Sequence, residues 1–288
     1  MKNNQINFIA EVSSNHAQDL KRAFDFIDKS ALAGCYAVKF QLFKLERLFS
    51  PEALRIKPEL LKRKTWELPL EFIPKLSERC QKRGIKFSCT PFYLDAVDEL
   101  SPYVDFFKIA SYELLWDDLL AKCANTGLPV IISTGMATLS EIEHAVEILK
   151  SNGCHNPVLL HCTSAYPTPY NEANLAAIET IRACTGCQVG WSDHTVDPGV
   201  MHRAIHKWGA TTIEFHMDLE GKGEEFSAGH CWLPDKIASV IKDVNHAFDA
   251  DGNGVKEPVI SELSDREWRA DPSDGLRPLR SIRESWKP

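Results

Sequence analysis

Two lysines occupy positions that are costly for a charged side chain unless an anion lies nearby. Lys39 falls inside the apolar run AVKFQ, and Lys108 falls inside FFKIAS, each near the end of a short hydrophobic segment. A lone lysine of this kind most often extends its ammonium group to the surface. Two lysines at equivalent positions, with serine close by, instead favour a site for a phosphate or carboxylate group.

Two histidines end two other hydrophobic segments, His194 in WSDHT and His216 in IEFHM. If these segments are neighbouring strands, about 5 Å apart, their imidazoles could share one divalent metal ion. Nitrogen ligands with open positions for oxygen suit Mn²⁺ best, and also Mg²⁺ or Co²⁺. Asp193 and Glu214 would then orient the two rings. The alternative is a pair of hydrogen-bonded pocket histidines without a metal.

The elements that must position these residues alternate between short β-branched or aromatic runs and longer amphipathic segments. This pattern is typical of βα units and a parallel sheet, and eight such units predict an α/β fold, a (β/α)8 TIM barrel of about 250 residues. A doubly wound open sheet is the second possibility, but no GxGxxG motif follows the first strand. The predicted strands are 6–12, 35–41, 85–90, 104–109, 128–133, 156–162, 187–192 and 211–216. The amphipathic segments that predict helices are 18–33, 68–83, 114–125, 138–152, 173–184, 197–208 and 234–247.

The active site of such a barrel lies at the carboxyl ends of its strands. Besides the two lysines and two histidines, these ends carry Glu11, Gln41, Thr90, Ser111, Glu113, Ser133 and Ser192. We expect the barrel to span 1–248, with 42–67 as a lid or substrate loop because it is too long for a plain connection. A short irregular tail, 249–288, is polar and rich in Arg and Pro and is not expected to fold as a domain.

The composition excludes several classes of protein. The 288 residues are 44% hydrophobic and 25% charged with a net charge of −7, which indicates a globular protein and argues against a nucleic-acid partner. No apolar run approaches the roughly 18 residues of a membrane span, and the first residues lack a signal sequence. We therefore expect a cytoplasmic protein without a membrane partner, whose nine scattered cysteines are reduced and mostly buried.

Eight ordered motifs between residues 8 and 216 resemble the sialic acid synthase family, the N-acetylneuraminate synthase-like enzymes. The motifs are FIAEVSSNH, AVKFQ, CTPF, FKIAS, VIISTGMATLSEIE, LLHCTSAYPTP, GWSDHT and EFH. Enzymes of this family are (β/α)8 barrels that condense phosphoenolpyruvate (PEP) with a sugar, using Mn²⁺ or Mg²⁺. The resemblance implies metal binding by His194 and His216, a role for Glu11 near the reacting carbons, and sugar contacts by Gln41 and Glu113. It implies PEP binding by Lys39, Thr90, Lys108, Ser111, Ser133, Tyr166 and Ser192.

The resemblance implies a metal-dependent transferase of sialic acid biosynthesis. PEP would add to an open-chain, N-acetylmannosamine-like sugar aldehyde, giving a 3-deoxy-2-keto (nonulosonic) acid and phosphate. We place Glu11, Lys39, Lys108 and Glu113 in the catalytic set. The alternatives are an octulosonate-type synthase using a phosphorylated sugar, for which Lys62–Lys64 would supply a phosphate site, a pyruvate aldolase, and a non-catalytic barrel partner of a full-length synthase.

Two departures from the family pattern bear on the sugar. The family reads GPDH after its second metal histidine, whereas this chain reads GKGEEFSAGHCW and places Ser227 at the position of that Asp. Glu224, Glu225 or His230 could take over its role. The family's C-terminal antifreeze-like domain is also expected to be missing, and a homodimer is possible.

Overall fold

The computed structural model describes residues 6–286, and the chain divides into two compact units, 1–245 and 246–288. The first unit contains all of the strands that the structure describes. The two units are described separately below.

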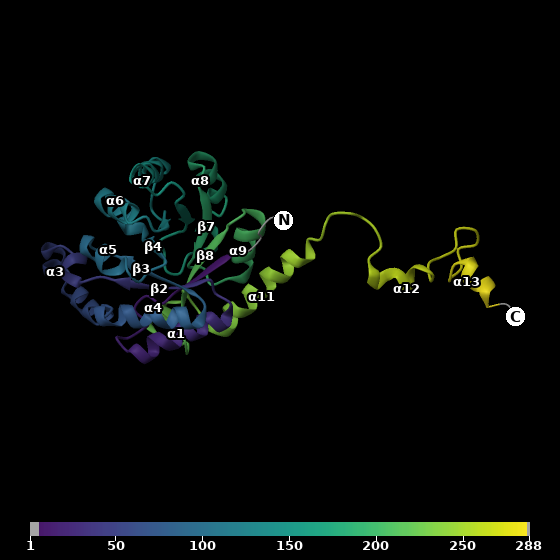
Figure 1. Ribbon diagram of the computed structural model, residues 1–288, viewed down its shortest axis with the longest axis horizontal. Helices are drawn as coiled ribbons and strands as arrows, with labels where there is room; N and C mark the ends of the chain where they lie inside the picture. The colour runs from purple at the N-terminus through teal and green to yellow at the C-terminus, as the bar shows by residue number, and fades with distance from the viewer. Residues whose placement is uncertain (1–5, 287–288) are drawn as a thin grey trace. The chain divides into compact units, whose positions relative to one another are not determined.

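Eight parallel strands pair in chain order, and β1 closes the sheet by pairing with β8, which confirms the predicted (β/α)8 barrel (Figure 1). A short ninth strand, which the sequence analysis did not predict, pairs with the end of β8. The strands are β1 Asn7–Glu11, β2 Ala37–Leu42, β3 Lys86–Pro91, β4 Phe106–Ile109, β5 Val130–Ser133, β6 Val158–His161, β7 Gln188–Asp193, β8 Thr212–Met217 and β9 Cys231–Trp232.

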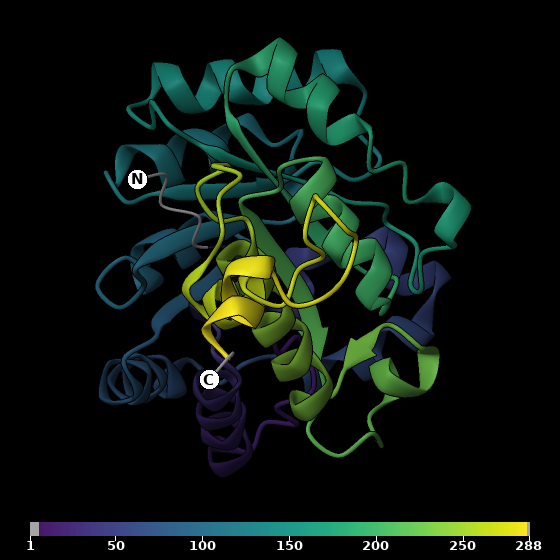
Figure 2. The same ribbon diagram turned by 90° about the vertical axis from the view of Figure 1, so that its right-hand side faces the viewer.

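The helices form a ring outside the strands, with α1 against α4, α6 against α7 and α7 against α8 (Figures 1 and 2). Of these helices, the sequence pattern missed only the short α5. The main helices are α1 Leu20–Ala33, α4 Ile73–Arg83, α5 Leu94–Leu100, α6 Asp117–Asn125, α7 Leu139–Ser151, α8 Ala177–Thr185, α9 Pro198–His202 with a π-helical continuation Arg203–Lys207, and α11 Pro234–Ala250.

Local signals in the sequence account for the ends of these helices. Thr138 caps α7 in a capping box with Glu141, in which each side chain bonds the other residue's backbone N–H. The Asp19 side chain accepts bonds from two backbone N–H groups of α1. Helix α1 ends at Gly34, whose φ of 89° is a left-handed conformation that glycine adopts without strain. The two N-terminal caps thus fix where α7 and α1 begin, and Gly34 fixes where α1 ends before β2.

The barrel interior is tightly packed between β7 and β8. A Cβ atom on Gly190 would lie 2.1 Å from the carbonyl oxygen of Thr212, so only glycine fits at this point of β7.

Eight of the nine cysteines are buried, and all nine are free thiols. Cys184 is the exposed one, and burial raises the pKa of Cys35, for example, to about 12.

The long connection between β2 and α4 folds into short helical pieces. They are α2 Leu45–Leu48, α3 Pro51–Ile56 and the 3-10 segments η1 Pro58–Trp66 and η2 Leu70–Phe72. The Gln18 side-chain amide, from the turn after β1, donates to the carbonyl oxygens of Lys64 at 3.3 Å and Glu67 at 2.9 Å. The carboxyl end of η1 is therefore anchored to the first βα turn.

The second unit contains short helices joined by loops (Figure 2). They are η6 Ile260–Glu262, α12 Leu263–Arg266 and α13 Arg280–Ser285. Its internal contacts include the Arg283–Asp274 ion pair at 2.7 Å and the rings of Trp268 and Trp286, whose centres lie 6.0 Å apart. No helix within residues 6–286 is long and apolar enough to cross a membrane.

Candidate active site

A cavity of about 960 Å³ lies at the carboxyl ends of the strands, where the sequence analysis expected the site. The predicted site residues that line it are Glu11, Lys39, Gln41, Lys108, Ser111, Glu113, Ser133, Tyr166, Ser192, His194 and His216. Thr90 does not line the cavity, but its hydroxyl accepts a bond of 3.2 Å from the Lys39 ammonium. The fold thus brings together every residue of the predicted site.

The two lysines meet two buried carboxylates at the floor of the cavity. Lys39 forms an ion pair with Glu11, and its Nζ lies 3.8 Å from Glu214 Oε2. Lys108 Nζ lies 3.2 Å from Glu214 Oε1. Glu214 therefore lies between the two lysines. The expectation that it orients the histidines is wrong, because the Nδ1 atoms of His194 and His216 bond Thr163 and Glu225 instead.

Burial and these ion pairs act in opposite directions on the pKa values. Burial disfavours the charged form of Glu214, but Lys108 and Lys39 outweigh it and hold the pKa of Glu214 at about 2. Burial also acts against the charge of Lys39, yet Glu11 and Glu214 raise its pKa above the ordinary value. For Lys108 burial is stronger than the attraction of Glu214, so its pKa is lowered.

Hydroxyl and amide groups surround this charged floor. Ser192 Oγ donates to Glu214 Oε1 at 3.1 Å, and the Gln41 amide donates to Glu11 Oε1 at 2.9 Å. Ser133 Oγ is buried and has no hydrogen-bond partner among the described residues. A buried hydroxyl that lines a cavity without a partner is available to a bound ligand.

Glu113 presents a carboxyl group with unusual acidity. It ends the 3-10 turn η3 Ser111–Glu113 after β4, and its Oε2 is buried without a hydrogen-bond partner in the described chain. Burial raises its pKa to about 7, although Lys108 acts in the opposite direction. A group with this pKa can both accept and donate a proton near neutral pH.

His194 and His216 lie together, with ring centres 5.5 Å apart, and Tyr166 packs against both rings. His194 Nδ1 donates to the carbonyl oxygen of Thr163 at 2.8 Å, and burial lowers the pKa of His194 to about 3. His194 is therefore a neutral imidazole with its Nε2 lone pair free of this bond, as metal binding requires.

Asp193 does not orient either histidine, contrary to expectation. Its oxygens accept bonds from the indole N–H groups of Trp191 at 3.1 Å and Trp232 at 2.9 Å, and from Thr195 Oγ1 at 2.6 Å. Asp193 is fully buried, so its carboxylate serves to join β7 to β9 beneath the site.

The segment after β8 supplies two further acidic or basic groups. Glu225, on α10 Glu224–Ala228, and His230 both line the cavity. Ser227 and Glu224 are exposed and do not line it. His216, Glu225, His230 and Cys231 bring potential ligand atoms within 4.8 Å of one another. The sequence departure at Ser227 is the signal that pointed to Glu225 and His230, without deciding between them.

The long loop after β2 forms an apolar wall of the cavity that includes Phe49, Leu60 and Trp66. Within the basic cluster 62–64, only Arg63 lines the cavity; its guanidinium lies over the rings of Phe49 and Trp66, 5.5 and 5.0 Å from their centres. Lys64 is instead paired with Glu46. The cluster thus contributes one cation to the cavity wall.

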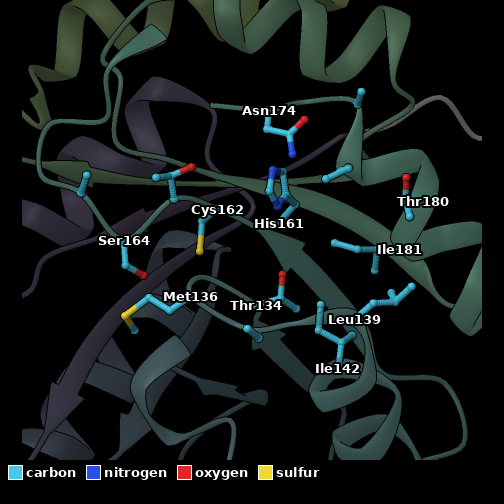
Figure 3. A pocket seen from close by; sticks show the side chains of 15 residues that line it. Thr134, Met136, Leu139, Ile142, His161, Cys162, Ser164, Asn174, Thr180 and Ile181 are labelled. Carbon is cyan, nitrogen blue, oxygen red and sulfur yellow. The ribbon is translucent and has the colours of Figure 1, made fainter. Parts of the chain in front are cut away.

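A second cavity of about 540 Å³ lies between β5, β6 and the helices α7 and α8 (Figure 3). Its lining combines aliphatic residues such as Leu139, Ile142 and Ile181 with polar ones such as His161 and Asn174. It shares only Cys162 with the larger cavity. The predicted site residues all belong to the larger cavity or its floor.

The NeuB family model matches residues 26–256. The chain belongs to the NeuB family. An uncharacterised protein of Methanocaldococcus jannaschii is 38% identical, covering 88% of this chain and 74% of its own length. The N,N'-diacetyllegionaminic acid synthase of Campylobacter jejuni is 34% identical, covering 88% of this chain and 80% of its own.

Solved structures of related proteins have the same fold as this NeuB-family chain. The N-acetylneuraminic acid synthetase of Leptospira borgpetersenii, in complex with citrate, has a TM-score of 0.80 and 32% identity, covering 94% of this chain and 93% of its own. The spore coat polysaccharide biosynthesis protein SpsE of Bacillus subtilis has a TM-score of 0.76 and 27% identity, covering 92% and 78%. The named relatives thus include a sialic acid synthetase and a legionaminic acid synthase.

Proposed function

We propose that this protein condenses PEP with an open-chain sugar aldehyde to give a nonulosonic, sialic-type acid and phosphate. One observation carries the proposal: two buried lysines and an unpartnered serine hydroxyl, Ser133, lie in the same cavity as two adjacent histidines. The first group of residues suits an anion such as PEP, and the two histidines could hold a divalent metal ion. The names of the relatives agree with this reaction.

Binding of PEP falls to the cavity floor. Lys39 and Lys108 hold its phosphate and carboxylate groups, exchanging part of their contact with Glu11 and Glu214 for contact with substrate. Ser111, Ser133 and Ser192 add neutral hydrogen bonds, and Tyr166 closes the side next to the histidines. Lys39, Lys108, Ser133 and Ser192 are already buried at this floor before PEP arrives, so the substrate meets groups that are largely shielded from bulk water.

Carbon 3 of PEP forms a bond to the aldehyde carbon, water adds at carbon 2, and phosphate leaves by cleavage of its C–O bond. Glu11, in a position fixed by Lys39 and Gln41, accepts one proton of that water, and this proton passes to the oxygen of the former aldehyde to complete the new hydroxyl group. The second proton of the water leaves with the phosphate when carbon 2 becomes the ketone. A divalent ion at His194 and His216, Mn²⁺ in our proposal, supplies Lewis-acid polarisation of the aldehyde oxygen when bound. Gln41 and Glu113 hold the sugar hydroxyls in the remaining space of the cavity.

A phosphorylated sugar is a second candidate substrate. Arg63 favours it, because this guanidinium lines the cavity and its described contacts are with aromatic rings. An arginine so placed can bind a phosphate group in a fixed geometry. The favoured substrate remains an unphosphorylated N-acetylmannosamine-like or diacetamido sugar, because the loop wall beside Arg63 is mainly apolar and suits acylamino groups.

Phosphate release from PEP with Mn²⁺ tests the proposal across sugars: N-acetylmannosamine, its phosphate ester, a diacetamido hexose and a phosphorylated pentose. We expect release with an N-acylated sugar, loss of activity in excess chelator, and recovery on adding Mn²⁺. Lys108→Met should remove turnover. The proposal is wrong if none of these sugars supports phosphate release and the protein also fails to bind PEP. If the protein prefers a phosphorylated sugar, the second candidate substrate is the correct one.

A further inference from the structure

The two histidines are held by partners of different kinds. His194 donates from Nδ1 to a backbone carbonyl, that of Thr163, at 2.8 Å. His216 donates from Nδ1 to a carboxylate oxygen, Glu225 Oε2, also at 2.8 Å. In both rings the Nδ1 proton is engaged, so the Nε2 lone pairs are the ones left for a shared ion. The PEP chemistry described above does not require Glu225, yet its carboxylate accepts the Nδ1 proton of His216.

Glu225 is itself fixed from several elements of the barrel. Its Oε1 accepts a bond of 2.9 Å from Ser14 Oγ, in the turn after β1. Its Oε2 lies 3.6 Å from His230 Nε2 and accepts a longer contact, 3.8 Å, from the thiol of Cys231. A carboxylate held at both oxygens can impose one orientation on the imidazole that it accepts from. This is the arrangement of a carboxylate–histidine–metal unit.

Direct coordination by Glu225 is the competing explanation, because His216, Glu225, His230 and Cys231 lie close enough to enclose an ion. In an octahedral site with bonds of about 2.1 Å, the geometry that Mn²⁺ and Mg²⁺ take, neighbouring ligand atoms lie about 3.0 Å apart. The His216–Glu225 separation of 2.8 Å is shorter than this and equals a charge-assisted hydrogen bond. The geometry therefore favours a hydrogen bond over shared coordination.

We propose that Glu225 is a positioning residue of the metal site: it holds His216 by Nδ1 so that Nε2, with that of His194, faces the ion. The inference rests on the proposed function only in placing an ion at these two histidines. It assigns a role to the segment 221–232, in which this chain departs from the GPDH pattern. Glu225, held by Ser14 and lying near His230, is thus the group of this segment that bonds His216.

Metal binding to the full chain, measured by competition with a chromophoric chelator, tests the inference without relying on turnover. Loss of a hydrogen-bonding partner of a metal-bound histidine typically weakens metal binding by about 10- to 100-fold, and we expect this for Glu225→Ala. Glu225→Gln keeps an acceptor oxygen without the charge and should weaken binding less. It also serves if the Ala variant fails to fold. Glu224→Ala, an exposed neighbour on the same helix, is the matched control and should bind as the unchanged protein does.

Co²⁺ absorption tests whether the ion is instead enclosed by the cluster that includes Cys231. We expect no thiolate-to-cobalt band, and we expect Cys231→Ser to leave both the spectrum and the affinity unchanged. A thiolate band that Cys231→Ser removes would overturn the inference, as would normal affinity in both Glu225 variants. If the unchanged protein binds no metal at all, the metal site of the proposed function fails as well, whereas tight binding that ignores Glu225 refutes the positioning role alone.

Discussion

At the scale of single residues, the floor of the cavity contains two positive and two negative side chains within one buried network. Glu214 joins both lysines, and Glu11 holds Lys39 on its other side. The charges balance before any substrate arrives. Each lysine therefore has two tasks, binding an anion and neutralising carboxylates that are out of reach of water, and a substitution will affect both.

Lys39→Met is expected to lower both stability and PEP affinity. Removing one partner of a buried ion pair costs about 3–5 kcal/mol, because the remaining carboxylate is left uncompensated. Loss of one charge-assisted contact, worth roughly 1.5–3 kcal/mol, should weaken PEP binding by about tenfold or more. Denaturant unfolding and titration calorimetry measure the two effects.

The double variant Lys39→Met with Glu11→Gln separates these effects. Neutralising Glu11 removes the uncompensated charge, so part of the lost stability should return while PEP binding stays weak. Recovery of PEP affinity in the double variant would contradict the assignment of Lys39 to the anion.

Glu113 should make stability depend on pH. Its pKa is about 7 in the folded protein, above the ordinary value of 4.5, because burial disfavours its charged form. Between these two values the folded chain holds a proton that the unfolded chain has lost, so this stabilising contribution is present below the ordinary pKa and is lost as pH rises through about 7. The loss is at most about 3 kcal/mol.

Glu113→Gln should remove this contribution. In denaturant unfolding at mildly acidic and mildly alkaline pH, the stability of the variant should fall less with rising pH than that of the unchanged protein. Equal slopes for the two proteins would show that Glu113 ionises normally in the folded state.

At the scale of elements, the strands were predictable because each is a short apolar run with a polar residue at its carboxyl end. Lys39, Lys108 and His216 stand out in the sequence for this reason, and the barrel brings them to one cavity. The helix α5 was missed because it is only seven residues long. Strand β9 has two residues and depends on pairing with β8, which leaves no local signal.

The roles of the carboxylates could not be predicted, because they depend on distances across the barrel. Asp193 and Glu214 lie within two residues of the histidines in the sequence, which suggested that they orient the rings. In the structure they bond instead to the indole groups of two tryptophans and to the ammonium group of a lysine. Glu225, near the end of the barrel sequence, accepts a hydrogen bond from Ser14, near its beginning. Tyr166 lies in an irregular segment after β6, where only the resemblance to a family pointed to it.

At the scale of the whole molecule, the site and the second unit draw on separate parts of the chain. Every residue that lines the larger cavity belongs to 1–245, and the NeuB match ends shortly beyond it, at residue 256. The larger cavity is therefore formed by residues of the first unit. A probe that reports on the barrel without responding to 246–288 would measure the unit that contains the proposed site.

The cysteines provide such a probe. A thiol reagent in excess should modify Cys184 quickly, while the buried thiols other than Cys162, which lines both cavities, react only when the barrel opens. Cys184→Ser should remove the fast phase and leave the slow one. No cysteine follows Cys231, so the rate of the slow phase reports on the opening of the barrel and not on 246–288. A bound substrate or metal should lower this rate. Ligands of this site could thus be recognised by the delay that they cause, before any product has been identified.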